Sequence, residues 1–526
     1  MTQDPQLAQE VARRRTFAII SHPDAGKTTL TEKLLLYGGA IELAGSVTAR
    51  RGRQRAASDW MALEQERGIS ITSSALQFEY RGHCLNLLDT PGHQDFSEDT
   101  YRTLMAADSA VMLLDAGKGV EEQTRKLFAV CRDRGLPITT WINKMDRPGR
   151  DPFELLDEVE EVMGLEAVPI TWPIGSGDRF RGVFERDAGR VHLFERTVGG
   201  SQRAPVVVAH ASQEGLADLL RAEDRDALMA DMEVLEGALP AFDREAFLQG
   251  RMTPVFFGSA VTNFGVENFL DRFVELAPPP GPLVTSGGPI PPDADFFSGF
   301  VYKVQANMSK AHRDRVAFLR VSSGRFERGM SATHVRLDRV IRLSYPHRLF
   351  GQERSTIDAA YAGDVIGLIN PGLFEIGDVV TSGPSFDIPH FPRFLPEHFA
   401  AARALDPSQR KGFLKGLAQL GEEGVVQIFR ERSGSPTPLL GAVGWLQFEV
   451  FKYRMAAEYG VEIALDTTPY TRIRWVRQAS QDNLKSFGHV VLDEAGRPAA
   501  LFKNDWEIRY SEEKQPDVIL SSVPLD

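Results

Sequence analysis

The chain has little cysteine and no long apolar run. Only two cysteines, Cys84 and Cys131, occur among 526 residues, which excludes a disulfide-stabilised scaffold and a thiolate metal cluster. No apolar run approaches the roughly 18 residues that span a bilayer, and residues 1–15 lack the apolar core of a signal peptide. We therefore expect a soluble protein of the reducing cytoplasm, without a membrane partner.

An excess of positive charge is also absent. The 60 Lys and Arg face 72 Asp and Glu, for a net charge of −12, which argues against general adhesion to nucleic acid and against DNA as a partner. The local exception is the basic run at residues 50–55, which is typical either of a solvated loop or of a contact to RNA phosphates. With 42% hydrophobic and 25% charged side chains, the length suits three or four globular domains.

A cluster of prolines predicts where the first domain ends. Residues 278–280 and 282 are prolines, and such a stretch is a semi-rigid spacer. Residues 1–280 alternate strand and helix patterns, which predicts an α/β domain with a parallel sheet and an insertion at about 165–250. Residues 281–390 read as an antiparallel β-barrel. Residues 391–526 read as an α+β domain, with a helix from about 441 to 459.

Four polar motifs each follow a short apolar run. They are Ser21-His22-Pro23-Asp24-Ala25-Gly26-Lys27-Thr28, Asp89-Thr90-Pro91-Gly92-His93, Asn143-Lys144-Met145-Asp146 and Gly258-Ser259-Ala260. Apolar runs of this kind indicate buried parallel strands. Each motif alone is degenerate, but the four in this order predict a single GTP- or GDP-binding site.

The first motif has the composition of a phosphate-binding loop. Consecutive backbone N–H groups at a helix start hold phosphates, and Gly26 allows close approach of the backbone. Lys27 is expected to reach the β- and γ-phosphates, and the Thr28 hydroxyl is expected to hold Mg²⁺. Ser21 departs from the consensus, which has glycine at this position.

The second motif is expected to sense the terminal phosphate. Asp89 at a strand end can hold Mg²⁺ through a water, and the Gly92 amide can approach the γ-phosphate, so that nucleotide binding is coupled to loop position. His93 follows directly and is expected to orient the attacking water, because phosphoryl transfer depends on positioning more than on a strong base. The alternative is an ordinary loop histidine.

The last two motifs predict the choice of base. A carboxylate at Asp146 matches the adjacent N1–H and N2–H₂ donors of guanine, which adenine lacks. Asn143 belongs to the same loop, and Lys144 can lay its stem along the base plane. The turn at Ser259 and Ala260 is expected to offer a backbone amide to the guanine oxygen.

Taken together, the motifs at residues 22–28, 67–70, 89–93 and 143–146 resemble those of the translational GTPases of elongation factor G type, and the likeness continues through residues 445–450. It covers essentially the whole chain. The resemblance implies a P-loop GTPase domain, a translation-factor β-barrel and a ferredoxin-like α+β domain. It also implies a monomer that binds the ribosome, its RNA and proteins, after peptide release and promotes GTP-dependent dissociation of class I release factors.

The same resemblance implies several residue roles. Asp24 matches an acidic position near the metal and the ribosomal RNA, and with Lys27 and His93 it completes the expected catalytic set. Ser70 stands where many relatives carry threonine, the switch hydroxyl on Mg²⁺, so Thr28, Ser70 and Asp89 are the expected metal ligands. Thr72 is a competing choice for the switch ligand.

Three alternatives remain open. A ribosome-protection or translocase-like GTPase of the same superfamily is the nearest, although only about 130 residues follow Pro396, too few for a translocase arm. A GTP-binding scaffold without functional hydrolysis would not need His93. A kinase or ATPase on the same loop would not need Asn143 and Asp146. No Gly-Gly-Gln tripeptide occurs, so hydrolysis of peptidyl ester is not expected.

Overall fold

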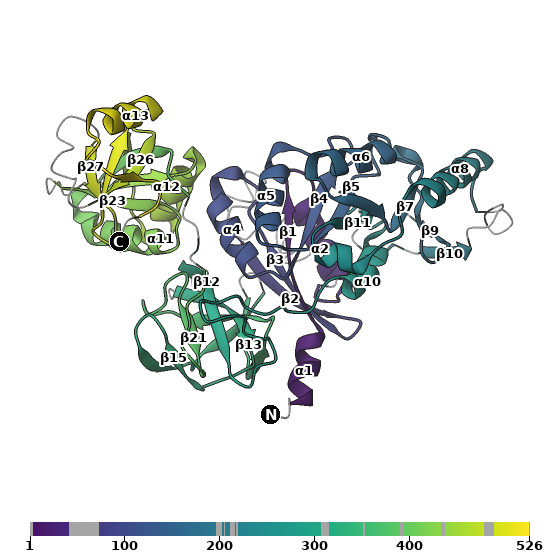
Figure 1. Ribbon diagram of the computed structural model, residues 1–526, viewed down its shortest axis with the longest axis horizontal. Helices are drawn as coiled ribbons and strands as arrows, with labels where there is room; N and C mark the ends of the chain where they lie inside the picture. Colours follow the sequence, from purple (N-terminus) through teal and green to yellow (C-terminus); the bar gives the residue numbers. More distant parts are fainter. Residues whose placement is uncertain are drawn as a thin grey trace.

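The computed structural model describes residues 4–41, 73–195, 202–204, 206–210, 216, 219–306, 315–350, 353–389, 391, 394–432, 437–477 and 489–524. Figure 1 shows the first part of the chain as a sheet with helices on both sides, with the barrel below it and the C-terminal part beside it, above the barrel. A short helix, α1 (Pro5–Ala12), precedes the sheet and packs Leu7 and Val11 against Ala362 of the barrel.

The central sheet is parallel except at one edge. Its order is β2-β3-β1-β4-β5-β11-β6, and among these strands β2 alone runs antiparallel to its neighbour. The strands are β1 (Arg14–Ser21), β2 (Ser74–Tyr80), β3 (His83–Asp89), β4 (Ser109–Asp115), β5 (Ile138–Asn143), β6 (Glu166–Pro169) and β11 (Met252–Phe257). The apolar runs before the four motifs thus lie in β1, β3, β5 and β11, as their burial pattern predicts.

Helices cover both faces of this sheet. One core contains α2 (Lys27–Tyr37) and α10 (Val266–Leu276), through side chains such as Leu34 and Phe273. The opposite core contains α4 (Ser97–Met105), α5 (Glu122–Asp133) and α6 (Pro152–Met163), through side chains such as Leu104, Leu127 and Val159. α6 begins where sequence rules place a helix start, because Asp151 accepts a hydrogen bond from Phe153 N and proline follows at the first helical position.

The insertion is smaller than the sequence suggests. β6 pairs with β11 in the main sheet, so the separate part begins after it, with a four-stranded antiparallel sheet in the order β10-β9-β8-β7. These strands are β7 (Thr171–Ile174), β8 (Gly182–Glu185), β9 (Arg190–Phe194) and β10 (Val206–His210), followed by α8 (Ala222–Ala238) and α9 (Arg244–Leu248).

The barrel is antiparallel and has its own core. Phe297, Val301, Leu319, Phe326 and Val380 are among its buried side chains. Its strands are β12 (Ser298–Ala306), β13 (Arg315–Ser323), β14 (Arg325–Glu327), β15 (Ser331–His334), β16 (Arg339–Arg342), β17 (Pro346–Phe350), β18 (Glu353–Thr356), β19 (Ala359–Tyr361), β20 (Val365–Ile369) and β21 (Val379–Thr381). β17 also pairs with β2, at Phe350 and Leu76, which makes the barrel and the central sheet continuous.

The C-terminal part begins with a ferredoxin-like unit. β22 (His398–Ala404), α11 (Arg410–Glu422), β23 (Gln427–Glu431), β24 (Leu439–Ala442), α12 (Trp445–Tyr459) and β25 (Ile463–Thr467) follow in that order. The strand order β25-β22-β24-β23 is that of a split βαβ fold. The helix expected from about residue 441 begins at Trp445, because Gly441 belongs to β24.

A second unit extends the same sheet beyond β23. It consists of β26 (Arg472–Val476), β27 (His489–Leu492), β28 (Pro498–Phe502), α13 (Asp505–Lys514) and β29 (Leu520–Ser521). Together the two units form an eight-stranded sheet.

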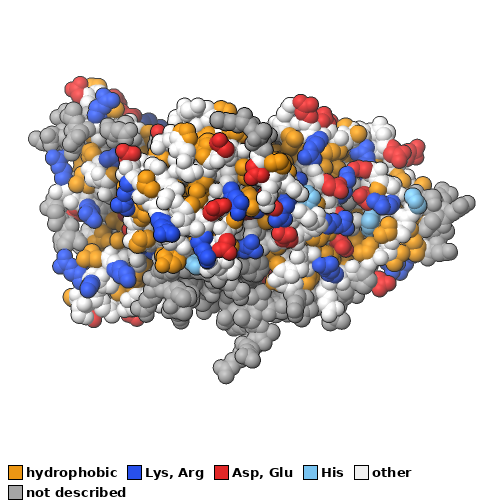
Figure 2. All heavy atoms as spheres, turned by 90° about the horizontal axis from the view of Figure 1, so that it is seen from below, with side chains coloured by type: hydrophobic (Ala, Val, Ile, Leu, Met, Phe, Trp, Pro, Cys, Tyr) orange, Lys and Arg blue, Asp and Glu red, His pale blue; other side chains and the backbone are white. Residues whose placement is uncertain are grey.

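No helix among the described residues is both long and apolar enough to cross a bilayer. On the face drawn in Figure 2, basic and acidic side chains are interspersed over much of the surface. This distribution agrees with a chain in which 60 basic residues are outnumbered by 72 acidic ones.

Candidate functional site: a phosphate loop and a base-binding edge

The turn between β1 and α2 forms a cradle for an anion. Ser21 ends β1 and Lys27 begins α2, and between them Asp24 and Gly26 have φ angles of 66° and 103°. A side chain at Gly26 would fall on Asn143 as well as strain the backbone, so glycine is required there. The turn encloses a cavity of about 230 Å³, lined by Ser21, His22, Pro23, Asp24, Gly26, Lys27, Thr28, Thr29, Gly92 and His93.

Lys27, which lines this cavity, pairs with the aspartate that ends β3. Lys27 Nζ lies 2.7 Å from Asp89 Oδ1, and both side chains are buried. Thr90 donates a hydrogen bond to Ile19 O at 2.6 Å, which fixes the start of the loop after β3 to the neighbouring strand. The first and second motifs are therefore held together by the protein itself.

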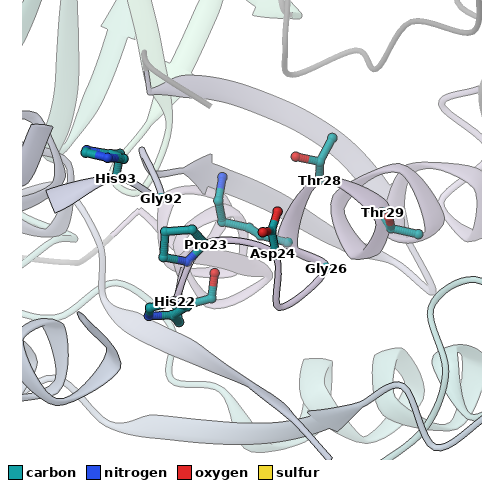
Figure 3. Close-up of a pocket in the computed structure, with 10 residues that line it drawn as sticks. His22, Pro23, Asp24, Gly26, Thr28, Thr29, Gly92 and His93 are labelled. Atoms are coloured by element: carbon teal, nitrogen blue, oxygen red, sulfur yellow. The ribbon is translucent and has the colours of Figure 1, made fainter. Parts of the chain in front are cut away.

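His93 lies at the rim of the cavity. Figure 3 shows it at the opposite end of the pocket from Thr28. Its Nδ1 is 3.3 Å from both the backbone nitrogen and the Oδ1 of Asp95. His93 is thus the N-cap of the short helix η1 (Gln94–Phe96), because its Nδ1 accepts a hydrogen bond from the backbone N–H of Asp95.

Asn143 joins the phosphate loop to the fourth motif. Its Nδ2 donates to Ala25 O and its Oδ1 accepts from Ala260 N, both at 2.9 Å. Both polar atoms of the side chain are therefore used within the protein. The arrangement makes Asn143 a brace between two loops of the candidate site.

Lys144 is held from two sides. Its backbone has a φ of 67°, and its Nζ donates to Asp24 O at 2.6 Å and to Asp115 Oδ2 at 2.7 Å. Burial alone would raise the pKa of Asp115, but the hydrogen bonds from Lys144 and from Gly117 N outweigh burial and leave this pKa below its usual value. Asp115 therefore stays charged and fixes the lysine stem.

Asp146 carries an unsatisfied acceptor at the same edge of the sheet. Its Oδ1 is buried and has no hydrogen-bond partner among the described residues, although burying a polar atom without a partner costs about 1–3 kcal/mol. The adjacent Met145 is buried and donates its N–H to Gly258 O at 3.2 Å, which fixes the loop that carries the carboxylate. The unpaired oxygen can accept from a ligand donor.

The fourth motif differs from expectation in one respect. Ala260 N is engaged by Asn143, and Ser259 N donates to Phe264 O at 2.9 Å. Neither amide of this turn is free to meet a guanine oxygen in this arrangement, because each is already used in bracing the loop. The expected role of Ser259 and Ala260 as amide donors requires the Asn143 contact to be shared or exchanged.

The expected switch residues Ser70 and Thr72 and the basic run at 50–55 lie outside the described residues. Sequence reasoning missed two residues that the structure brings to the site, Asp95 and Asp115. Asp115 could have been predicted, because it follows an apolar run at the end of β4 just as Asp89 does at the end of β3. Asp95 had none, since its partner lies in the C-terminal part of the chain.

Comparison with protein families accounts for nearly the whole chain. Residues 12–279 match the model described as elongation factor Tu GTP binding domain, and residues 296–383 match elongation factor G domain 2. Residues 388–512 match the model described as class II release factor RF3, C-terminal domain. The three matches follow the order of the parallel sheet, the barrel and the C-terminal sheet.

Full-length relatives give the same picture. Peptide chain release factor 3 of Gloeobacter violaceus is 55% identical over 98% of this chain and 98% of its own length. The protein of the same name from Nostoc punctiforme is 54% identical over 98% of this chain and 96% of its own. A crystal structure of a Thermus thermophilus protein, 23% identical, has a TM-score of 0.71 over 92% of this chain and 72% of that one, which supports the fold.

Proposed function

Because the chain belongs to the peptide chain release factor 3 family, it is a translational GTPase that acts on the ribosome, and we propose that it binds and hydrolyses GTP at the phosphate loop described above. The resemblance to translational GTPases is confirmed. Its function is to bind the ribosome after peptide release and to promote GTP-dependent dissociation and recycling of class I release factors. The match of residues 388–512 to the C-terminal domain of class II release factor RF3 favours this function over the runner-up, a ribosome-protection or translocase-like factor.

The unpaired Oδ1 of Asp146 is the main observation that supports a preference of the site for guanine over adenine. A buried acceptor without a partner gains most from a ligand that brings donors, and guanine presents N1–H and N2–H₂ side by side. Lys144, held by Asp24 O and Asp115, is placed to lay its stem against the base. Adenine would leave the carboxylate unpaired, which disfavours ATP.

The phosphate side requires an exchange of partners. Lys27 is proposed to leave Asp89 and to bind the β- and γ-phosphates, since its Nζ now lies 2.7 Å from that carboxylate. Thr28 and Asp89 then supply a hydroxyl and a carboxylate oxygen, the ligand types that Mg²⁺ prefers. When bound, Mg²⁺ neutralises charge on the phosphate oxygens. Ser70 or Thr72 is proposed as the further switch ligand.

Hydrolysis is assigned to the loop after β3. The Gly92 amide is proposed to approach the γ-phosphate, and His93 is proposed to orient the attacking water. Both residues line the cavity beside the phosphate loop. Asp24, exposed at the tip of the loop, is proposed to lie near the metal and the ribosomal RNA, with Lys27 stabilising the charge that develops on the phosphates.

Several finer points belong to the same proposal. We propose that residues 1–280, 281–390 and 391–526 act as GTPase domain, barrel and C-terminal domain, and that the protein works as a cytoplasmic monomer without DNA or a membrane as partner. Class I release factors are proposed as its protein partners on the ribosome. The distribution of charge supports localised rather than general contact with RNA.

The decisive experiment is a chase of labelled class I factor from post-termination ribosomes. We expect this protein to displace the factor with GTP or a nonhydrolysable analogue, but not with GDP. Its own departure from the ribosome should require hydrolysis. Release that does not depend on which nucleotide is supplied would refute the recycling function and leave nucleotide binding intact.

A further inference from the structure

The carboxylate of Asp95 lies between His93 and the C-terminal part of the chain. Its Oδ1 is 3.3 Å from His93 Nδ1, and its Oδ2 accepts a hydrogen bond of 2.8 Å from the backbone N–H of Leu446. Leu446 stands in the first turn of α12. A single side chain therefore contacts both the histidine assigned to hydrolysis and another domain.

The contact to α12 has the geometry of a helix cap supplied from outside. The residue before α12 is Gly444, which has no side chain with which to cap its own helix. Asp95 takes that place, because it accepts from the second residue of the helix as a local N-cap side chain would. A Cβ at Gly444 would fall on the Asp95 carboxylate, so the glycine leaves the space that the contact needs.

The electrostatics favour a charged carboxylate there. Burial would raise the pKa of Asp95, but the contacts with His93 and the Leu446 N–H outweigh it, and the pKa lies below its usual value. The positive end of the α12 dipole adds to this preference. Asp95 is only 6% exposed, so its two contacts are shielded from bulk water.

Neighbouring contacts attach the same two domains. Phe96 packs with Leu446 and Val450 in a small buried cluster. One turn along α4, Arg102 donates to Glu423 O of the C-terminal part at 3.4 Å and pairs with Glu98. The loop that carries His93 and the helix that follows it are therefore fixed to α12 and to the end of α11 while the domains are docked.

The docked arrangement also fixes His93. Its Nδ1 accepts a hydrogen bond from the backbone N–H of Asp95 and lies 3.3 Å from the carboxylate Oδ1 of the same residue. Figure 3 places His93 at the opposite end of the pocket from Thr28. A side chain that orients water must bring a ring nitrogen toward the γ-phosphate. Moving His93 in this way while Asp95 keeps its bond to Leu446 would separate the imidazole from the carboxylate.

We propose that Asp95 is a positioning residue that restrains His93 while α12 is docked, so that separation of the C-terminal domain from η1 and α4 permits GTP hydrolysis. The inference rests on the proposed role of His93. It adds that a partner which moves the C-terminal domain controls the rate of GTP hydrolysis through the contact between Asp95 and α12. The competing explanation is that Asp95 only joins two domains and does not affect turnover.

The test breaks the contact from each side. Asp95→Ala removes the carboxylate, and Gly444→Ala leaves Asp95 in place but fills its space on α12. We expect each to raise ribosome-free, single-turnover GTP hydrolysis by roughly tenfold, within the range of coupling between linked sites. The double variant should gain no more than either single change, because both remove the same contact.

Two matched controls separate this effect from general loosening. Glu422→Gln removes the contact of Arg315 with Glu422, which joins the barrel to the C-terminal part without touching η1. Gly237→Ala adds a methyl where nothing lies within 4 Å. Both should leave the ribosome-free rate unchanged. Hydrogen exchange should show faster exchange of residues 443–452 in Asp95→Ala and Gly444→Ala, and not in the controls.

The role of His93 is tested by combining His93→Ala with Gly444→Ala. We expect the acceleration to disappear, since a freed loop without the imidazole cannot orient water. Unchanged or slower hydrolysis in both single variants, despite faster exchange at α12, would overturn the proposal, as would acceleration that survives loss of His93. Binding of fluorescent GDP to the wild-type protein is measured separately, so that failure of the nucleotide site itself is recognised.

Discussion

The base half and the phosphate half of the proposed nucleotide site are held in different ways. In the base half, Asn143 joins the loop after β1 to the loop after β11 through its hydrogen bonds with Ala25 O and Ala260 N. Lys144 joins the loop after β1, at Asp24 O, to Asp115 at the end of β4. All of these anchors belong to one sheet. The loops of the base half are therefore anchored to the sheet within one domain, and the rearrangement needed to receive guanine is confined to the contact between Asn143 and Ala260.

The phosphate half is held by other parts of the molecule. Asp95, two residues beyond His93, contacts Leu446 of the C-terminal part. Ser73, which follows the segment containing Ser70 and Thr72, accepts hydrogen bonds from Lys303 of the barrel at 2.6 and 2.8 Å and donates to Asp99 at 2.9 Å. The comparison teaches that affinity can be set within one domain while turnover responds to the arrangement of three.

The largest effect should come from the phosphate half. His93→Ala should lower ribosome-stimulated kcat by about 10²–10³-fold, the usual cost of removing one preorganised polar group at a reacting centre. GTP affinity should change by less than about twofold, because the imidazole positions water and adds no uniform binding. The check is single-turnover hydrolysis on ribosomes together with nucleotide titration.

His83→Ala supplies the control for this prediction. It removes a histidine of the same domain at the start of β3, at the end of the strand away from Asp89. Stimulated turnover should be unaffected. If His93→Ala retained full stimulated kcat, the division of labour between the two halves would be wrong.

In the base half, the largest change expected is in specificity. Asp146→Asn replaces the acceptor for guanine by an amide that suits xanthine. Loss of a hydrogen bond to a charged group costs about 1.5–3 kcal/mol, so GTP should bind roughly 10–100-fold more weakly. Competition between GTP and xanthosine triphosphate measures the exchange of preference, and equal GTP binding by the variant would contradict the assignment.

A smaller effect is expected when the brace between the loops is removed. Asn143→Ala leaves Ala25 O and Ala260 N without their partner, at about 1–3 kcal/mol for each buried group that stays unpaired. GDP and GTP should both bind about tenfold more weakly, and the melting temperature should fall. Thermal shift and titration with each nucleotide measure the two effects.

Thr140→Val is the matched control, since Thr140 lies in the same strand and pairs with Thr253 at 2.8 Å away from the nucleotide loops. It should lower the melting temperature without a change in nucleotide affinity. Should Asn143→Ala weaken GTP but not GDP, the brace would belong to the phosphate half instead.

The strands that carry the loops of both halves were predictable from sequence. Short apolar runs followed by polar motifs placed β1, β3, β5 and β11 correctly, because strands buried on both faces leave a continuous apolar signal. The expected parallel sheet, barrel and α+β architecture is confirmed. What the motifs could not reveal was that Asn143 and Ala260 use each other as partners.

Contacts between domains could not be predicted from the sequence, for a physical reason. Asp95 and Leu446 are 351 residues apart, and only the docking of α12 brings them together. The local pattern also misplaced the start of that helix, since the apolar residues of β24 continue into it and only Gly444 marks the change. The added strand β6 escaped notice because its four residues resemble the short strands of the insertion.

The smallest effect concerns Asp115, which anchors Lys144. Its pKa is lowered in the folded protein, so its ionised form adds stability above the unfolded pKa, and this contribution is lost as the pH falls through the folded pKa. Asp115→Asn should therefore lower the melting temperature slightly at pH 7, by the equivalent of about 1 kcal/mol or less. The difference from wild type should shrink toward zero in acid. An unchanged melting temperature of Asp115→Asn at pH 7 would show that Lys144 relies on Asp24 O alone and that the base half is less firmly tied to the sheet than its hydrogen bonds indicate.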